Sequence, residues 1–421
     1  MNILYDFVTL GLKTGAGEYA RRVFFELLDR IERQKQDTHV YALIDSKQPV
    51  VYDDMQEKVL NKRNIKFVDI QESSFHNLIE RYKIDRFFIA CSQHVAKYED
   101  IVNIRCDVVC VTHDMCIEEQ YANRVRPFFV LCKQHSIELA KLSMKEKLKK
   151  MLFPRIRVDN FLKWYISVEG FHGLSNDLSY MNRIKKLSDD NPRMRHIVVS
   201  EYTKHSMIYH LGIDEKRITV LYSPERLMNE CDTIINPSLE ELIDSHKTFY
   251  LMVSCHRSEK NPTKALHAFQ KYVADHKDKF IVTIGYGEVL FQNHIDLPFL
   301  SESDLANAYK HCYALIYPSF YEGFGYPPIE AMHYAKPVLC SDVTSIPEIL
   351  CESPIYFSPM YENSIFMALN KLNSYNYDYY CKQSFKQYSI IRKRQDRDLS
   401  SLIDIIISTN MHNTHNCNIT R

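Results

Sequence analysis

The chain has little glycine, almost no tryptophan and no long apolar run. Its 421 residues include one tryptophan and 10 glycines. That glycine content is about a third of the roughly 7 % found in an average protein. No run approaches the ~18 apolar residues of a membrane span, and the N-terminus lacks the cationic start and apolar stretch of a signal peptide. We therefore expect a cytoplasmic protein. A hydrophobic fraction of 45 % with only 15 prolines excludes collagen-like and disordered classes.

Net charge is also absent. The 53 basic and 53 acidic residues cancel, so no overall field attracts nucleic acid, and we expect no nucleic-acid partner. The 12 cysteines form no Cys-x-x-Cys pair and indicate reduced thiols. Cys106, Cys110, His113 and Cys116 are close enough in sequence to suggest a zinc site. However, alternation along a strand at 107–112 points Cys106 and Cys110 away from His113, so we expect no metal there.

What the chain does have is an alternation of short apolar runs with helical patterns, which predicts βα units and parallel sheets covered by helices. The helix after the first strand is the clearest, because one apolar stripe repeats at helical spacing. Its members are Ala20, Val23, Phe24, Leu27, Leu28 and Ile31. The candidate strands are 3–8, 40–44, 66–70, 86–90, 107–112, 197–200 and 218–222, and then 249–254, 280–284, 313–317, 338–341 and 355–357.

A polar stretch with two prolines separates these two groups of strands. We therefore predict an N-terminal Rossmann-like domain at 1–222, a link at 223–247 and a second domain at 248–385. The remaining residues, 386–421, are expected to form helices and a tail that pack back on the N-terminal domain.

The region 115–195 is predicted to be a helical insertion of different charge balance. Within it, residues 141–164 are basic, amphipathic and end at Trp164, which suits the surface of an anionic membrane. A solvated helix face packed on its own domain explains the same pattern, and both interpretations stay open.

The densest motif is the segment 317–332, YPSFYEGFGYPPIEAM. It predicts a buried strand, an acid at Glu322, a loop with Gly323 and Gly325, and a helix with Pro328 and Glu330 in its first turn. The free N–H groups of such a helix start bind anions, and glycines let the backbone approach a ligand. The two acids could hold two parts of one ligand. They could equally be acids that complement the helix dipole.

This segment, together with KPV at 336–338, resembles the Glu-x7-Glu signature of the retaining nucleotide-sugar glycosyltransferases of family 4, also called group 1. The resemblance implies an α/β fold of GT-B type, in which two tandem Rossmann-like domains face each other across a cleft. It also implies that Glu322, with Gly323, Phe324 and Gly325, binds the donor sugar, and that Glu330 binds the nucleotide ribose.

Two cations follow the first strand of the second domain, Arg257 and Lys260, and Asn261 and Pro262 could cap and open the next helix. A guanidinium and an ammonium beside free amides suit a diphosphate and the charge that grows on it as it leaves. Ordinary surface charges would give the same pattern. The family commonly places this Arg and Lys five residues apart, whereas here the spacing is three, which makes Lys260 the more secure assignment.

Near the N-terminus, Gly15 and Gly17 open the striped helix and resemble the family's glycine-rich loop that faces the donor phosphates. The same residues fit Gly-x-Gly-x-x-Ala, ending at Ala20, which is a dinucleotide fingerprint. About six residues separate it from the first strand, which weakens that match. An NAD(P)-dependent Rossmann enzyme, such as a nucleotide-sugar epimerase, remains an alternative.

Other positions match the family singly. His113, after the strand at 107–112, resembles its donor-sugar histidine, and Gly285 and Gly287 resemble its second Gly-x-Gly pair. Phe299 and Leu300 resemble its base-binding turn, with Leu300 as the binding residue, followed by a helix cap at 303–305. An Asp-x-Asp pattern at 396–398 is the manganese motif of the other main glycosyltransferase fold, but we interpret it here as a solvated helix face. Since GT-B members need no metal, the resemblance implies no cofactor.

The resemblance thus implies a retaining glycosyltransferase that moves a hexose-type sugar from a UDP or GDP sugar to an acceptor hydroxyl. The basic segment at 141–164 suggests a lipid-linked saccharide acceptor at the inner membrane face, as in capsule, O-antigen or lipopolysaccharide synthesis, and a soluble saccharide acceptor stays open. A non-catalytic GT-B scaffold of a polysaccharide assembly complex is the alternative from another class.

Overall fold

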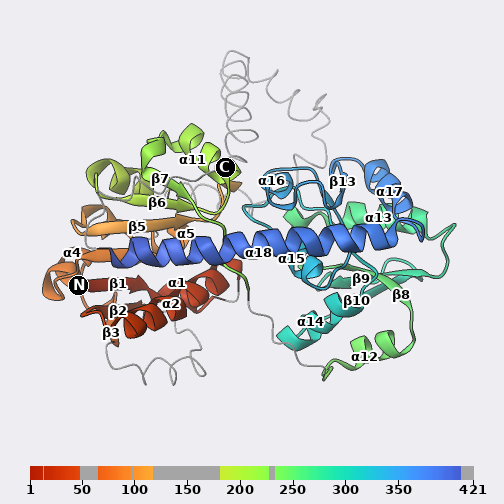
Figure 1. The fold of residues 1–421 in the computed structure, drawn as a ribbon, viewed down its shortest axis with the longest axis horizontal. Coiled ribbons are helices and arrows are strands. Elements are labelled where there is room, and N and C mark those ends of the chain that lie inside the picture. The colour runs from red at the N-terminus through yellow and green to blue at the C-terminus, as the bar shows by residue number, and fades with distance from the viewer. Residues whose placement is uncertain (13, 48–64, 97, 117–180, 227–232, 409–421) are drawn as a thin grey trace, which may run out of the picture.

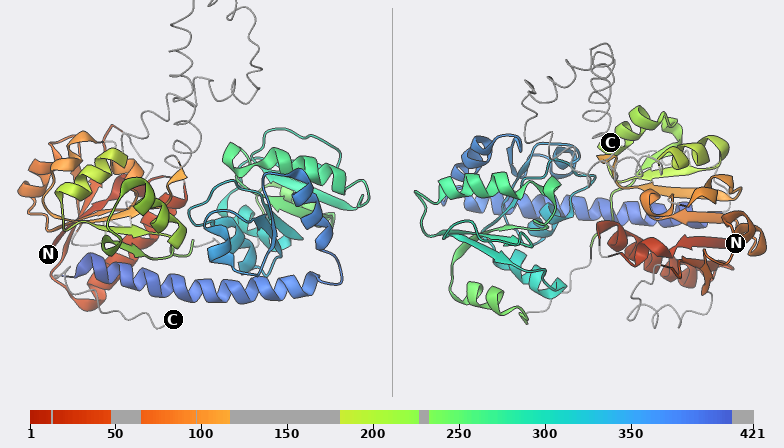
Figure 2. Two further views of the ribbon diagram at one scale, coloured as in Figure 1. Left: turned by 90° about the horizontal axis from the view of Figure 1, so that it is seen from above. Right: turned by 180° about the vertical axis from the view of Figure 1, so that it is seen from behind.

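The computed structural model describes the chain except residues 13, 48–64, 97, 117–180, 227–232 and 409–421. Two α/β units lie side by side, and the long helix α18 (Tyr377–Ile407) runs along both of them (Figures 1 and 2). The two facing units and their shared helix set the positions of all the loops discussed below.

The N-terminal sheet has seven strands in the order β3-β2-β1-β4-β5-β6-β7, and every pair is parallel. The strands are β1 (Asn2–Asp6), β2 (His39–Ile44), β3 (Ile65–Asp69), β4 (Arg86–Ile89), β5 (Asp107–Thr112), β6 (Arg195–Val198) and β7 (Ile218–Val220). The described helices around it are α1 (Phe7–Leu10), α2 (Gly15–Gln34), α4 (Phe75–Arg81), α5 (Ser92–Val95), α11 (Glu201–Leu211) and a helical stretch at 181–190, with short 3₁₀ turns at Glu99–Asn103 and Glu215–Arg217.

The C-terminal sheet has six parallel strands in the order β10-β9-β8-β11-β12-β13. They are β8 (Thr248–Met252), β9 (Lys279–Ile284), β10 (His294–Leu297), β11 (Ala314–Tyr317), β12 (Val338–Ser341) and β13 (Ile355–Phe357). Its helices are α12 (Pro237–Asp244), α13 (Pro262–Tyr272), α14 (Glu302–His311), α15 (Tyr326–His333), α16 (Ile346–Leu350) and α17 (Glu362–Lys371), with a 3₁₀ turn, η4, at Ser258–Lys260. The twelve predicted strands are confirmed, three of them with the predicted bounds and the others with one or both ends shifted by one or two residues. Strand β10 was not predicted.

Helix α2 forms for the reason that its sequence indicates. All six residues of the apolar stripe are buried, and the Thr14 side chain caps the helix by accepting a hydrogen bond from the Gly17 N–H at 3.3 Å. The first strand is shorter than predicted. Asp6 ends it, because its carboxylate accepts hydrogen bonds from the backbone and hydroxyl of Thr9 and so starts helix α1.

One hydrophobic core joins the two units. It contains side chains of helix α2, of the second sheet and of helix α18, for example Phe24, Leu315, Ile391 and Ile403. Helix α18 packs on α15 of one unit and on α2 of the other. It is a single helix that begins at Tyr377, nine residues before the boundary that we predicted.

Helix α18 also binds the chain where it crosses between the units. Asp398 accepts a hydrogen bond from the Tyr222 N–H at 2.9 Å, and Gln395 donates to the Ser223 carbonyl at 2.8 Å. Asp398 is only 3 % exposed. The interpretation of 396–398 as a solvated face is therefore wrong for Asp398, although Asp396 is exposed. The segment 223–247, which we expected to be only a link, includes helix α12, and this helix buries Leu239 and Leu242.

Arg86 anchors the end of helix α18 to the N-terminal sheet. Its side chain is 1 % exposed and donates from Nη1 to the carbonyls of Ile405, Ile406 and Ser408 at 2.7 to 2.8 Å. Nη2 pairs with Asp107 at 3.1 Å. Carbonyls at the C-terminal end of a helix lack N–H donors from a following turn, and a buried guanidinium supplies donors here. The Ile405 carbonyl also accepts from the Ser408 hydroxyl at 3.2 Å.

Replacing Arg86 by Met is therefore expected to destabilise the protein by about 3–5 kcal/mol, because the helix end and Asp107 lose a buried partner. The matched control is Arg193→Gln, since Arg193 pairs with the same Asp107 at 3.4 Å but is 53 % exposed. That control should cost about 1 kcal/mol or less. Urea unfolding followed by circular dichroism measures both. Equal midpoints for the two variants would contradict the anchoring role.

Among the described residues, no helix combines the length and the apolar character that crossing a bilayer requires. The basic segment 141–164 and most of the predicted insertion lie outside the described residues.

Candidate active site

The candidate site lies at the carboxyl ends of two neighbouring strands, β8 and β11. The strand order of the second sheet reverses here, because β8 pairs with β9 on one side and with β11 on the other. Ligands of open α/β sheets bind at such a point. The loop after β8 carries Lys260 on the turn η4, and the loop after β11 carries Glu322.

Lys260 and Glu322 form a buried ion pair. Lys260 Nζ lies 2.5 Å from Glu322 Oε1, and the two side chains are 10 % and 11 % exposed. The Tyr317 hydroxyl donates to the same carboxylate oxygen at 2.5 Å and accepts from Lys260 Nζ at 3.3 Å. The structure thus brings together the two residues that the sequence singled out.

Tyr317 was not identified from the sequence, because a tyrosine at the end of an apolar strand looks like a core residue. Burial, followed by the negative charge of Glu322, raises the pKa of Tyr317 well above its usual range. Its hydroxyl therefore keeps its proton and acts as a hydrogen-bond donor to Glu322.

The backbone of Glu322 is also fixed. Its N–H donates to the Thr344 hydroxyl at 3.1 Å, and its carbonyl accepts from the Ser345 hydroxyl at 2.9 Å. Thr344 and Ser345 lie directly before helix α16. The segment before this helix therefore fixes both the N–H and the carbonyl of Glu322.

Arg257 lies beside this pair but is held less tightly. Its side chain is 53 % exposed, and Nε lies 2.5 Å from Glu259 Oε1. Asn261 holds the N-cap position of helix α13, as predicted, but its side chain makes no capping hydrogen bond, so that part of the expectation is wrong. Its backbone is left-handed, with φ of 54°, and its amide donates instead to the carbonyls of Pro318 and Pro359 at 3.2 and 3.0 Å. Helix α13 does begin at Pro262, as predicted.

The glycine loop meets the N-terminal unit at Gly323. A Cβ at this position would lie 1.9 Å from the carbonyl oxygen of His113, so only glycine allows the two backbones to approach. The next residue of that strand end, Asp114, faces the same loop. Burial, followed by the charge of Glu322, raises the pKa of Asp114, whereas Arg257 and Lys260 lower it.

Two further contacts hold the units together here. The Tyr321 hydroxyl accepts from the Met115 N–H at 3.3 Å. Glu348 of helix α16 accepts from the Glu201 and Tyr202 N–H groups at 2.9 and 3.0 Å, and so caps helix α11 of the other unit. The two units are thus in direct contact beside the candidate site.

His113 is held as a neutral ring. Nε2 lies 3.0 Å from the Ala90 carbonyl, which can only accept, so this nitrogen carries the proton. Burial lowers the pKa of His113 to about 4. The ring stands edge-on to the Tyr19 ring of helix α2, with 4.8 Å between the ring centroids. Cys106 and Cys110 pack in a separate apolar cluster of this unit, and no described group of three His, Cys, Asp or Glu residues is placed to hold a metal.

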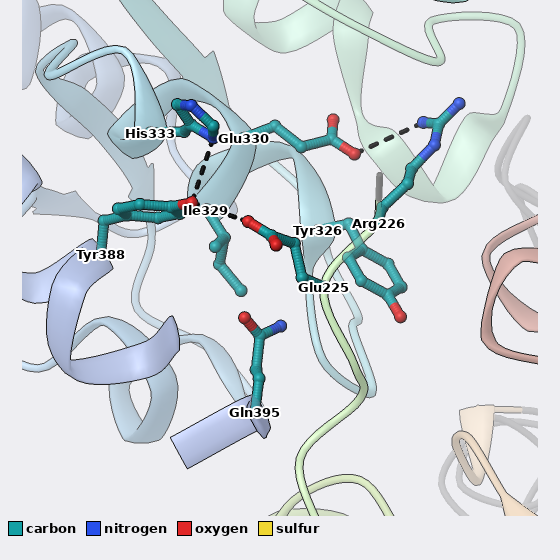
Figure 3. Close-up of a pocket in the computed structure, with 8 residues that line it drawn as sticks. All are labelled: Glu225, Arg226, Tyr326, Ile329, Glu330, His333, Tyr388 and Gln395. Atoms are coloured by element: carbon teal, nitrogen blue, oxygen red, sulfur yellow. Dashed lines mark hydrogen bonds and ion pairs between the residues drawn. The ribbon is translucent and has the colours of Figure 1, made fainter. Parts of the chain in front are cut away.

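Helix α15 begins at Tyr326, two residues before Pro328, because Gly325 adopts a left-handed backbone with φ of 87°. Glu330 therefore lies in the second turn, and its expected place in the first turn is wrong. Its carboxylate is buried and accepts a hydrogen bond from the Tyr309 hydroxyl at 2.7 Å. It also pairs with Arg226 at 3.4 Å, as Figure 3 shows. The sequence offered no signal for Arg226, which lies in the segment predicted to be a link.

Of the two N-terminal glycines, Gly15 lies at a contact between the units, and Gly17 packs against its own unit. A Cβ on Gly15 would lie 3.5 Å from the Tyr326 ring, and a Cβ on Gly17 would lie 1.9 Å from the Leu12 carbonyl. Helix α1 stands between the first strand and Gly15. A dinucleotide fingerprint needs the glycines directly after the strand, so the structure disfavours that alternative.

The glycine pair 285 and 287 forms a turn with φ of 77° and 97°, a backbone region that glycine adopts without steric cost. The N–H groups of Tyr286 and Gly287 donate to the Asp296 carboxylate at 3.0 and 2.8 Å, so these amides are already bound. Phe324 is 5 % exposed and packs against Tyr222 and Tyr326, which leaves only its backbone near the loop surface.

The predicted base-binding turn lies at the edge of the second sheet. Leu300 packs partly buried against the core, whereas Phe299 is 71 % exposed and stands 5.0 Å from the His256 ring. The following helix, α14, is capped by Ser301 rather than within 303–305. Asp304 instead accepts from the Ile235 N–H at 2.7 Å.

The comparisons with known proteins agree with this geometry. Residues 236–355 match the family model of glycosyl transferases group 1. The chain is 31 % identical over 195 residues to O-antigen chain mannosyltransferase RfbU of Salmonella typhimurium, covering 43 % of this chain and 51 % of that protein. It is 43 % identical over 63 residues to O-antigen chain mannosyltransferase B of Escherichia coli, covering 15 % and 16 %. The match thus spans about half of the first relative and less of the second.

Among solved structures, Alr3699/HepE of Anabaena in complex with UDP-glucose superposes with a TM-score of 0.59 at 14 % identity, covering 96 % of this chain and 98 % of that one. The two facing α/β domains define a GT-B fold. Within the C-terminal domain, which carries the ion pair and the glycine loop, residues 236–355 resemble the group 1 glycosyl transferases.

Proposed function

We propose that the protein is a glycosyltransferase that moves a hexose-type sugar from a nucleoside diphosphate to an acceptor hydroxyl. The observation that carries this proposal is the buried Lys260–Glu322 pair, which lies at the reversal point of the donor-domain sheet. The residue after Glu322, Gly323, meets the backbone of His113 of the other domain. The relatives named as O-antigen mannosyltransferases support O-antigen or lipopolysaccharide synthesis, and mannose as the hexose. The neighbour solved with UDP-glucose supports a nucleotide-sugar donor.

The site divides the work between its charges. Glu322 accepts hydrogen bonds from hydroxyls of the donor sugar, and Glu330 accepts hydrogen bonds from hydroxyls of the ribose. Lys260, helped by the half-exposed Arg257, stabilises the negative charge that develops on the leaving diphosphate. In the ligand-free pair each buried charge satisfies the other, so both are already in place when the donor arrives.

We further propose that transfer retains the anomeric configuration and needs no metal. The acceptor attacks from the face that the leaving diphosphate occupied, with no covalent nucleophile on the protein. Diphosphate charge that other enzymes neutralise with a metal ion is neutralised here by Lys260 and Arg257.

The proposed acceptor is a lipid-linked saccharide at the inner face of a membrane, with the N-terminal domain holding it. The basic segment 141–164 supports this, because a cationic amphipathic segment binds anionic lipid. Liposome flotation tests it. The protein should float with anionic vesicles at low salt and much less at high salt, and failure to float at low salt would favour a soluble acceptor.

The donor is found by a hydrolysis and transfer screen with UDP- and GDP-hexoses, including GDP-mannose, in the presence and absence of EDTA. We expect one donor to release its nucleoside diphosphate, at a rate that EDTA leaves unchanged. A protein that binds and turns over none of these donors would instead be a scaffold with an inactive cleft.

A further inference from the structure

Arg226 carries a guanidinium that is only partly satisfied. Nη1 donates to Glu330 Oε1 at 3.4 Å, and Nη2 lies 3.9 Å from Glu302 Oε1. Nε is buried and has no hydrogen-bond partner in the described part of the chain. Because a guanidinium has five N–H donors, this side chain retains donors for a further acceptor.

The position of Arg226 is fixed by its neighbours in the chain. The Tyr326 hydroxyl donates to the Pro224 carbonyl at 3.0 Å, and Gln395 of helix α18 donates to Ser223. Glu225 accepts from the Tyr388 hydroxyl at 2.6 Å and pairs with Arg392 (Figure 3 shows the tyrosine contact). The backbone of the crossing between the two domains is therefore fixed beside Arg226, and this fixes where Arg226 meets the donor domain.

Arg226 is also the cation that faces a group of acids. Burial lowers its pKa, but the charges of Glu330 and Glu18 outweigh burial, and with Glu302 they leave the pKa above its usual value. Glu18 belongs to the first turn of helix α2 in the N-terminal domain. A diphosphate that entered among these three carboxylates would be repelled without a positive charge between them.

The same contacts locate Arg226 along the proposed donor. On one side is Glu330, proposed to hold the ribose. On the other side is the first turn of helix α2, where Gly15 approaches the Tyr326 ring. Burial raises the pKa of Tyr326 and lowers that of Arg226, and the negative charge of Glu18 in this turn raises both. Between a ribose and a glycine-rich helix start lies the diphosphate, so Arg226 stands at the ribose–diphosphate junction.

We propose that Arg226 is a donor-binding residue: its guanidinium contacts the diphosphate of the nucleotide sugar and offsets the acids around it. This inference rests on the proposed function and adds a binding residue contributed by the interdomain crossing. Donor binding then depends on the crossing as well as on the two domains.

The test is calorimetric titration of full-length protein with UDP and GDP at 50 and 300 mM NaCl. Arg226→Gln should weaken binding about tenfold or more, since one charge-assisted contact is lost. The loss of one ionic contact should also make binding less sensitive to salt. Arg226→Lys, which keeps the charge, should recover part of the affinity. Arg33→Gln is the control, because Arg33 is 63 % exposed and pairs with Glu26 further along α2.

The outcomes separate the two proposals. Suppose that the wild type binds a nucleoside diphosphate. If Arg226→Gln binds it equally well, or binds it more weakly with the same salt dependence as the wild type, Arg226 has no role in holding the diphosphate. If the wild type binds neither nucleotide at either salt concentration, the proposed function itself fails, and the role of Arg226 fails with it. Melting temperatures of all variants show whether any loss comes from unfolding.

Discussion

Lys260→Ala is expected to lower turnover by at least tenfold, and by on the order of 100-fold if Lys260 is the main cation on the leaving diphosphate. The loss should fall mainly on kcat, because the charge on the diphosphate is greatest in the transition state. The measurement is steady-state release of nucleoside diphosphate from the cognate donor.

The variant leaves Glu322 as a buried carboxylate without its cation, so stability must be followed as well. Lys260→Gln, which keeps a hydrogen-bond donor, separates loss of charge from loss of folding. Lys264→Ala is the matched control, since Lys264 lies one turn further on and its ammonium donates to the Met360 carbonyl at the surface. Near-normal turnover in folded Lys260→Ala would remove Lys260 from the mechanism.

Gly323→Ala is expected to have the second large effect. Its Cβ would lie 1.9 Å from the His113 carbonyl oxygen, and relieving that clash requires the two backbones to move apart by roughly 1 Å. A displacement of that size beside reacting groups can lower the rate about 100-fold. We expect a large fall in kcat/KM and also a lower melting temperature, because the clashing groups are both backbone and the two units share one hydrophobic core.

Gly212→Ala is the contrasting control. Nothing lies within 4 Å of a Cβ there, but φ is +63°, which disfavours any side chain. That variant should lose stability by about 1 kcal/mol and keep its turnover. Full activity in Gly323→Ala would show that the close approach of Gly323 to His113 is unnecessary.

The sequence predicted the strands well because buried parallel strands are short, continuous apolar runs. It also singled out Lys260 and Glu322, each of which follows a strand of the second domain. The ion pair itself was not predictable, because the family resemblance assigned the two residues to different parts of the donor.

Several of the errors share one physical cause, which is a partner far away in the sequence. Asp398 looked solvated among charged residues, but its partner is the backbone of Tyr222. Asn261 looked like a helix cap, but two distant proline carbonyls bind its amide. Arg226 and Tyr309 carry no local signal, and only the fold brings them to Glu330.

The central claim is transfer of a sugar from a nucleoside diphosphate at the Lys260–Glu322 pair. It is tested most directly by a proton NMR time course with purified protein, the donor found in the screen and a saccharide acceptor. The account predicts that nucleoside diphosphate and a glycoside appear together, that the glycoside keeps the anomeric configuration of the donor, and that folded Glu322→Gln loses most of the rate. An inverted product, or equal rates for wild type and Glu322→Gln, would contradict it.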